Sequence, residues 1–125
     1  MDGVIIVNKK KGMTSFDVAN KVGKILGTKK IGHTGTLDPL AEGVLVLCLG
    51  EATKIAELIT SYDKEYIAGV KLGIETDTYD IEGKVLKEVE IDKELDVSNV
   101  LNRFKKTYLQ EVPKYSAVKI ERAHV

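Results

Sequence analysis

The longest uninterrupted apolar run in the chain, Val44 to Leu49, has only six residues. A helix that crosses a bilayer needs about 20 predominantly apolar residues, so this run is too short to span a membrane. It is also short for a buried helix, whereas its valines and leucines suit a buried β-strand. The run therefore predicts a core strand among other short elements. The first residues lack the pattern of a secretion signal, and we therefore expect a cytoplasmic protein.

A second strand and a helix are expected before that run. Gly3 to Val7 is a β-branched segment bounded by a lysine-rich turn, and it predicts another buried strand. Thr14 or Ser15 can cap the helix that follows, which should end at Gly27. The apolar residues on one face of this helix recur at spacings of four, three and one: Val18, Val22, Ile25 and Leu26.

The second half of the chain alternates less regularly. We expect a helix over residues 51–60, strands over residues 65–72 and 84–91, a polar connection over residues 76–83, and a helix that Asp96 caps. This order predicts an α+β (mixed α/β) fold, and the length of the chain favours one domain. The residues expected in the core are Val4, Ile6, Val18, Val22 and Phe104, and the single cysteine, Cys48, should also be buried.

Charge is distributed unevenly along the chain, although 19 basic residues balance 19 acidic ones. Residues 1–33 carry seven lysines against two aspartates, whereas residues 75–111 carry ten acidic residues against six basic ones. A lysine-rich segment is more often a solvated surface than a nucleic-acid site. Charge alone therefore leaves both interpretations open.

The segment from Gly32 to Pro39 is too polar and too rich in turn formers to lie in the core. Its Asp-Pro pair is typical of a turn, but a carboxylate on a rigid loop can also act as a nucleophile, a base or a metal ligand. A calcium loop over residues 78–89 is excluded because Val89 occupies the position of the bidentate glutamate. His33 and His124 do not form a helical zinc pair, and no phosphate-binding Gly-Lys-Ser/Thr is present. We therefore expect no metal and no nucleotide cofactor.

Four segments in order resemble the motifs of TruB-type pseudouridine synthases. The most specific is residues 32–45, Gly-His-Thr-Gly-Thr-Leu-Asp-Pro-Leu-Ala-Glu-Gly-Val-Leu, which is similar to the family's catalytic motif over its whole length. Residues 8–15 are similar to the first family motif, residues 63–66 to its Lys-x-Tyr segment, and residues 110–119 to a fourth block. The resemblance implies a largely antiparallel sheet flanked by helices. Residues 1–125 would be the amino-terminal portion of the catalytic domain, without its carboxy-terminal part and RNA-binding domain.

The resemblance also implies a reaction, in which a uridine in the T-arm of tRNA is isomerised to pseudouridine. Asp38 would be the nucleophile, at C1′ of the ribose or at C6 of the base. Tyr66 would stack on the flipped base, and His33 would touch the target nucleotide. The implied partner is tRNA, and no membrane is involved. An isomerisation needs no redox equivalent and no phosphate energy, so the resemblance implies no cofactor and no metal. The lysines that we expect to contact phosphates are Lys9, Lys10, Lys11, Lys29 and Lys30.

The chain departs from the family pattern in places. Lys10 and Val112 stand where prolines are usual, and Arg122 and His124 replace a glycine and an arginine after the fourth block. The family arginine that pairs with the catalytic aspartate belongs to the part beyond residue 125. An alternative function is therefore a truncated RNA-binding remnant without turnover. A purely structural α+β module would explain the Asp-Pro turn but not four motifs in order.

Overall fold

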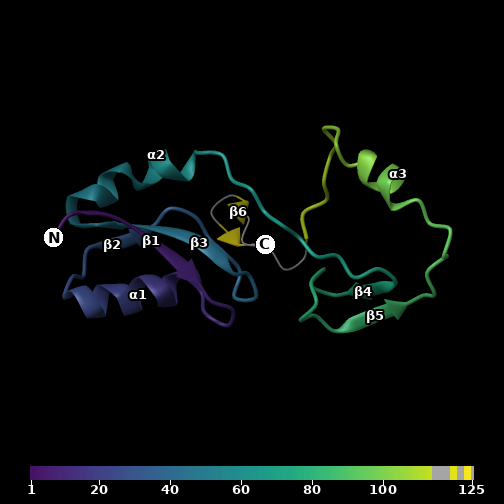
Figure 1. The fold of residues 1–125 in the computed structure, drawn as a ribbon, viewed down its shortest axis with the longest axis horizontal. Helices are drawn as coiled ribbons and strands as arrows, with labels where there is room; N and C mark the ends of the chain where they lie inside the picture. The colour runs from purple at the N-terminus through teal and green to yellow at the C-terminus, as the bar shows by residue number, and fades with distance from the viewer. Residues whose placement is uncertain (114–118, 121–122, 125) are drawn as a thin grey trace. The chain divides into compact units, whose positions relative to one another are not determined.

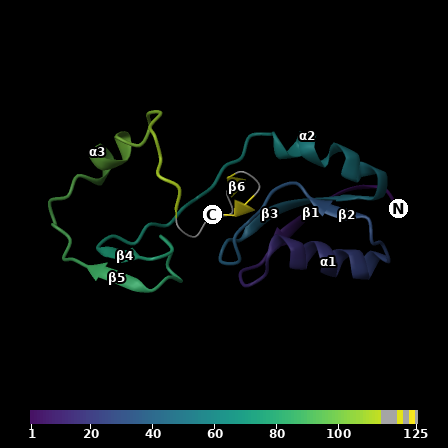
Figure 2. The ribbon, with the colours of Figure 1, turned by 180° about the vertical axis from the view of Figure 1, so that it is seen from behind.

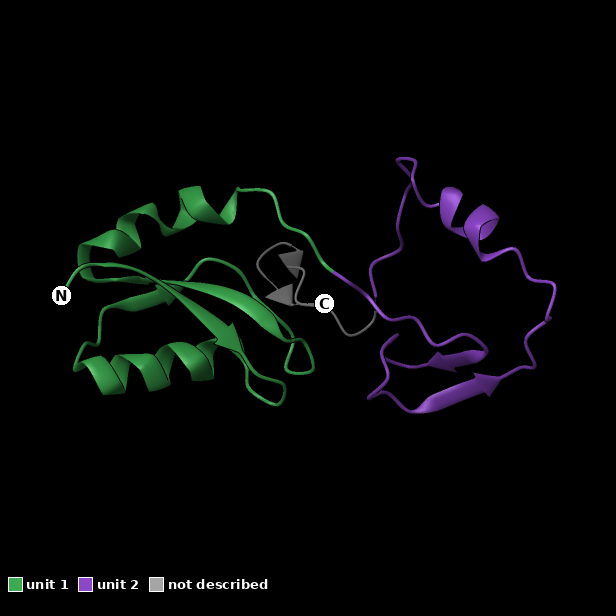
Figure 3. Ribbon diagram, in the orientation of Figure 1, with its two compact units in different colours: residues 1–66 green, residues 67–125 purple. Residues whose placement is uncertain are grey.

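The computed structural model describes residues 1–113, 119–120 and 123–124, and the chain divides into two compact units, residues 1–66 and 67–125 (Figure 3). Unit 1 contains β1 (Gly3–Lys9), α1 (Ser15–Leu26), β2 (Ile31–His33), β3 (Gly43–Leu49), the 3₁₀ helix η1 (Gly50–Ile55) and α2 (Ala56–Thr60). Unit 2 contains β4 (Ile74–Thr76), β5 (Val85–Glu88), α3 (Val97–Asn102), β6 (Lys119–Ile120) and β7 (Ala123–His124). This mixture of helices and antiparallel strands confirms the α+β class.

The sheet of unit 1 has the order β1-β3-β2, and β3 is antiparallel to both neighbours. The predicted apolar run thus forms the central strand, with Val7 opposite Leu45 and His33 opposite Leu47. Helix α1 lies along one face of this sheet, and η1 and α2 lie along the other (Figures 1 and 2). The sheet is therefore the middle layer of unit 1.

The core lies between α1 and the sheet. Successive side chains of a strand point to opposite faces, so Leu45 and Leu47 of β3 face the helix together. They pack against Val18 and Ala19 of α1, with half-buried residues around them: Val7, Met13, Val22, Ile31 and Leu37. Cys48 is fully buried, as expected, and burial raises the pKa of its thiol.

Three residues predicted to be in the core are exposed. Val4 and Ile6 alternate with the half-buried Ile5 and Val7 along β1, so they point away from α1, to the face along which η1 and α2 lie, and those helices do not bury them. Phe104 follows the short helix α3, and its ring contacts that of Tyr108 edge to face, with 6.1 Å between the ring centroids. Most of the Phe104 surface is nevertheless exposed. Alternation in the sequence identifies two faces, but it does not say which of them is covered.

Several element boundaries also differ from the prediction. Residues 65–72 do not form a strand, because their alternating apolar side chains have no neighbouring strand to pair with in the described structure. The helix expected over residues 51–60 is present as η1 followed by α2, and the strand expected over residues 84–91 is the shorter β5. Helix α3 begins as predicted, with an Asp96 carboxylate oxygen accepting a 3.0 Å hydrogen bond from the amide of Asn99.

Strands β4 and β5 form an antiparallel hairpin in unit 2. One carboxylate oxygen of Asp80 accepts hydrogen bonds from the Thr78 hydroxyl (2.8 Å) and from the amides of Glu82 (2.9 Å) and Gly83 (3.1 Å). Asp80, which belongs to the segment that superficially resembles a calcium loop, therefore stabilises the turn that connects these strands. Within the described residues, no helix is both long enough and apolar enough to traverse a bilayer.

Candidate active site

Asp38 lies on the loop between β2 and β3 and is exposed to solvent. The preceding strand β2 includes Gly32 and His33, so the loop is shorter than predicted and begins at Thr34. The amide of Ala41 donates a 3.0 Å hydrogen bond to the carbonyl of Asp38, which closes a turn over Pro39. Asp38 is therefore the first residue of a tight turn, and its side chain is exposed.

The backbone on both sides of Asp38 is held by the segment that leads from β1 into the first residue of α1. The Ser15 hydroxyl accepts a hydrogen bond from the Leu37 amide (2.9 Å) and donates one to the Leu37 carbonyl (3.3 Å). The carbonyl of Pro39 accepts a 2.7 Å hydrogen bond from the amide of Gly12. Two segments that the sequence separates by more than 20 residues thus form one substructure around the carboxylate.

Lys9 occupies a different position from the exposed one that we expected for a phosphate contact. Its side chain is fully buried, and its ammonium group donates to the carbonyl oxygens of Met13 (2.6 Å), Lys10 (3.2 Å) and Pro39 (3.3 Å). These three acceptors match the three donors of a lysine ammonium. In this arrangement Lys9 joins the turn after β1 to the loop that carries Asp38, and it presents no charge to a ligand.

His33 lies in β2, half-buried and opposite Leu47. Its Nδ1 atom is buried and has no hydrogen-bond partner among the described residues. A buried ring nitrogen without a partner loses free energy relative to a hydrated one. The next residue, Thr34, continues the strand pairing through its amide, which donates to the Val46 carbonyl at 3.0 Å.

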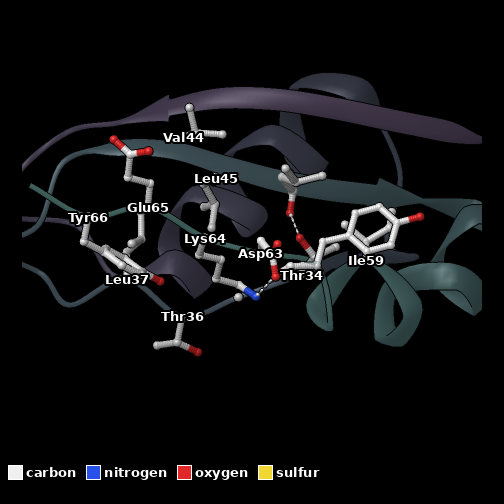
Figure 4. Close-up of a pocket in the computed structure, with 13 residues that line it drawn as sticks. Thr34, Thr36, Leu37, Val44, Leu45, Ile59, Asp63, Lys64, Glu65 and Tyr66 are labelled. Carbon is white, nitrogen blue, oxygen red and sulfur yellow. Dashed lines mark hydrogen bonds between the residues drawn. The ribbon is translucent and has the colours of Figure 1, made fainter. Parts of the chain in front are cut away.

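A pocket of about 330 Å³ opens beside the loop that carries Asp38 (Figure 4). One wall is formed by loop residues 34–37 and the other by residues 62–66, with Leu45 and Ile59 between them. Tyr66 borders this pocket and keeps 65% of its surface exposed. Leu37 borders it too, so the pocket reaches the residue next to Asp38, although Asp38 and His33 themselves are outside its lining.

The other predicted phosphate contacts are exposed. Lys29 and Lys30 precede β2, and the ammonium group of Lys30 forms an ion pair with Glu51, which is also paired with Lys54 at 2.6 Å. The hydrogen bonds from Lys30 and Lys54 lower the pKa of the Glu51 carboxyl. Among the described residues, no group of three or more His, Cys, Asp and Glu side chains is placed to hold a metal ion.

Sequence reasoning missed the role of Ser15, which it considered only as an alternative helix cap. The structure assigns the cap to Thr14, whose hydroxyl accepts a 3.0 Å hydrogen bond from the amide of Asp17. Two adjacent hydroxyl residues at a helix start were the available signal, because only one of them is needed for capping. The second hydroxyl is then free to bind the loop.

Comparison with known proteins gives matches along almost the whole chain. The family model described as TruB family pseudouridylate synthase (N terminal domain) matches residues 23–124. The tRNA pseudouridine synthase B of Fusobacterium nucleatum is 53% identical over 123 residues, which cover 97% of this chain and 42% of that protein. The protein of the same name from Clostridium tetani is 54% identical over 123 residues, covering 97% of this chain and 43% of that protein.

A solved structure described as an H/ACA RNP bound to a substrate RNA containing 2′-deoxyuridine aligns with a TM-score of 0.44 and 45% sequence identity, over 45% of this chain and 18% of that one. The chain spans less than half the length of the curated relatives that it matches. The catalytic-loop sequence resembles that of TruB-type enzymes, the family model matches most of the chain, and about half of the residues are identical to those of these relatives. The chain therefore belongs to the TruB family of pseudouridylate synthases.

Proposed function

We propose that this chain carries the catalytic aspartate of a tRNA pseudouridine synthase, which isomerises a uridine in the T-arm of tRNA to pseudouridine. The observation that carries the proposal is the loop of residues 34–42, where the exposed Asp38 is held from both sides next to a pocket that Tyr66 borders. Family membership supplies the reaction type. The proposed substrate places the protein in the cytoplasm.

In the proposed reaction, the bond from ribose C1′ to uracil N1 breaks, the base turns, and a bond forms from C1′ to C5. The proton on C5 is lost and N1 gains one, so the product has the same composition as the substrate. The Asp38 carboxylate is the nucleophile, at C1′ or at C6 of the base. An exposed carboxylate suits both forms of attack, because a ribose or a base can approach its oxygens.

The target uridine is stacked inside a folded RNA arm, so the proposal requires that it be flipped out at a free-energy cost of a few kcal/mol. An aromatic ring can replace part of the lost stacking. Tyr66 borders the pocket, and its largely exposed side chain has a face available for a base. We assign to Tyr66 the stacking role, and to the half-buried His33 a contact with the target nucleotide.

Exposed lysines on two segments of unit 1 would contribute affinity through phosphate contacts. Lys29 and Lys30 precede β2, and Lys10 and Lys11 lie in the turn whose Gly12 binds the loop. Such contacts are independent of base sequence and weaken as salt rises. Lys9 is omitted from this set because its ammonium group is already bonded to three carbonyls.

The test is to replace Asp38 with asparagine in the full gene product and to measure pseudouridine in a T-arm stem-loop by chemical labelling. Losing a covalent nucleophile should lower kcat by at least about 1,000-fold, which corresponds to about 4 kcal/mol of barrier. RNA affinity should stay within about threefold, because the phosphate contacts are unchanged. Turnover within tenfold of the parent would contradict the assignment of Asp38.

The same assay applied to residues 1–125 alone distinguishes the enzyme from the RNA-binding remnant. We expect this piece to bind the stem-loop weakly and to form little or no pseudouridine, because the relatives have more than twice its length. Full turnover by residues 1–125 would show that the remaining part is dispensable. Binding without turnover by the full gene product would favour the remnant.

A further inference from the structure

Ser15 makes an unusual pair of contacts with the catalytic loop. Its side chain is 2% exposed, and its hydroxyl both accepts from the Leu37 amide (2.9 Å) and donates to the Leu37 carbonyl (3.3 Å). A hydroxyl has one donor and two acceptor sites, so a single Ser15 side chain satisfies both backbone groups of one residue. Leu37 immediately precedes Asp38, and its carbonyl belongs to the peptide group that joins the two residues, so its orientation affects the direction in which the Asp38 side chain leaves the backbone.

The helix that begins at Ser15 does not need this hydroxyl. Thr14 is the N-cap of α1, and it forms a reciprocal capping box with Asp17: the Thr14 hydroxyl accepts from the Asp17 amide and the Asp17 carboxylate accepts from the Thr14 amide, each at 3.0 Å. The Ser15 hydroxyl is therefore available to the loop alone.

The other side of Asp38 is anchored independently. The Pro39 carbonyl accepts the 2.7 Å hydrogen bond from the Gly12 amide, and the proline ring fixes its own φ angle. Asp38 thus lies between two anchored residues: Leu37 is bonded to Ser15 at the start of α1, and Pro39 is bonded to Gly12 in the turn before it. Removing the Ser15 hydroxyl would release the Leu37 side and leave the Pro39 side in place.

We infer that Ser15 is a positioning residue for Asp38, which holds the Leu37 peptide so that the carboxylate keeps one orientation toward the ribose or the base. This inference rests on the proposed function. Ser15 is buried and does not touch the substrate, so it acts through the loop backbone. A misplacement of about 1 Å between reacting groups can lower a rate by about 100-fold, whereas binding through distant phosphate contacts is unaffected.

The experiment compares Ser15→Ala with Thr14→Ala in the full gene product. Both variants remove one hydroxyl from the start of α1, but only Ser15→Ala removes the bonds to Leu37. We expect Ser15→Ala to lower kcat by about 10- to 100-fold with KM for the stem-loop within about twofold. Thr14→Ala should lower the denaturation midpoint through its lost cap and leave kcat within about twofold of the parent.

Amide hydrogen exchange at Leu37 provides a readout that does not depend on turnover. In Ser15→Ala this amide loses its acceptor and should exchange at least about tenfold faster, while the amides of Leu45 and Leu47 in β3 keep the parent rate. Faster exchange at all three positions would mean general destabilisation and would overturn the inference, as would an unchanged rate at Leu37 or a kcat within twofold of the parent. If the parent itself forms no pseudouridine, the proposed function fails, and the Leu37 exchange rate still decides whether Ser15 holds the loop.

Discussion

At the scale of single residues, Lys9 shows how a charged side chain can be part of a packed interior. Its ammonium group is surrounded by three carbonyl oxygens, at 2.6, 3.2 and 3.3 Å. Hydrogen bonds from a charged donor are stronger than neutral ones, and they offset the unfavourable removal of the ammonium from water. Lys9 therefore stabilises the turn before α1 and the loop that carries Asp38 at the same time.

We predict that Lys9→Met lowers the free energy of unfolding by about 2 kcal/mol, because methionine fills a similar volume and leaves buried carbonyls unpaired. Lys10→Met is the matched control: the side chain of Lys10 is exposed, and its loss should change stability by less than about 0.5 kcal/mol. Urea denaturation of the two variants and the parent at pH 7 measures the difference. Coincident curves for Lys9→Met and the parent would disprove the structural role.

The sequence predicts the environment of Asp38 better than that of Lys9. An Asp-Pro pair among glycines indicates an exposed turn, and the structure confirms that Asp38 is exposed in one. Lysine is almost never fully buried, so a lysine-rich turn is naturally assigned to the surface. The burial of Lys9 depends on the carbonyls of Met13 and Pro39 converging on one point, and neither composition nor periodicity contains that information.

At the scale of elements, helix α1 is stabilised at its start by the carboxylate of Asp17, whose pKa is lowered in the folded protein. The hydroxyl and the backbone amide of Thr14 donate hydrogen bonds to the Asp17 carboxylate, and these bonds lower the pKa of that carboxyl. A group whose pKa is lower in the folded state than in the unfolded state stabilises the fold when it is ionised.

We predict that the stability difference between the parent and Asp17→Asn depends on pH. The contribution of the ionised Asp17 should be complete above the ordinary carboxyl pKa of about 4 and should disappear as the pH falls through the lower pKa of the folded state. Urea denaturation at pH 7, 5 and 3.5 should therefore show a difference in the free energy of unfolding between the two proteins that becomes smaller on acidification. A difference that becomes larger on acidification would contradict the assignment.

The absence of the strand predicted over residues 65–72 could not have been foreseen from the residues of that segment alone. The segment 65–72 alternates as a strand does, but alternation describes a strand only where another strand supplies the hydrogen bonds, and the described residues supply none to it. Helix α1, in contrast, has local signals, and its cap and terminal glycine are present in the structure. Of its predicted apolar face, Val18 is buried and Val22 and Leu26 are half-buried, whereas Ile25 is exposed. Local chemistry is readable from sequence, whereas pairing is not.

At the scale of the whole chain, the two units differ in how much apolar surface they bury. Among the described residues, every hydrophobic side chain that is fully buried belongs to unit 1, and all four side chains of β5 in unit 2 are exposed. Burial of apolar surface is the main favourable contribution to folding. Unit 1 should therefore hold most of the stability of residues 1–125.

We predict that amide hydrogen exchange of residues 1–125 is at least about 100-fold slower in β3 than in β5, after correction for intrinsic rates. The central strand is bonded on both edges and packs against α1, whereas β5 has one partner and no buried side chain. Mass spectrometry of peptic fragments resolves the two segments. Equal protection would mean that unit 2 is stabilised by contacts that its exposed side chains do not indicate.

The order β1-β3-β2 has a consequence for the newborn protein on the ribosome. Both edge strands are synthesised before the central strand that joins them, so Gly3–Lys9 and Ile31–His33 have no partner until Leu49 has left the exit tunnel. Translation adds about 5–20 residues per second, so the apolar residues of β1 wait several seconds without a sheet. The Asp38 loop is made during that interval. It takes its final shape only when the strand made after it closes the sheet.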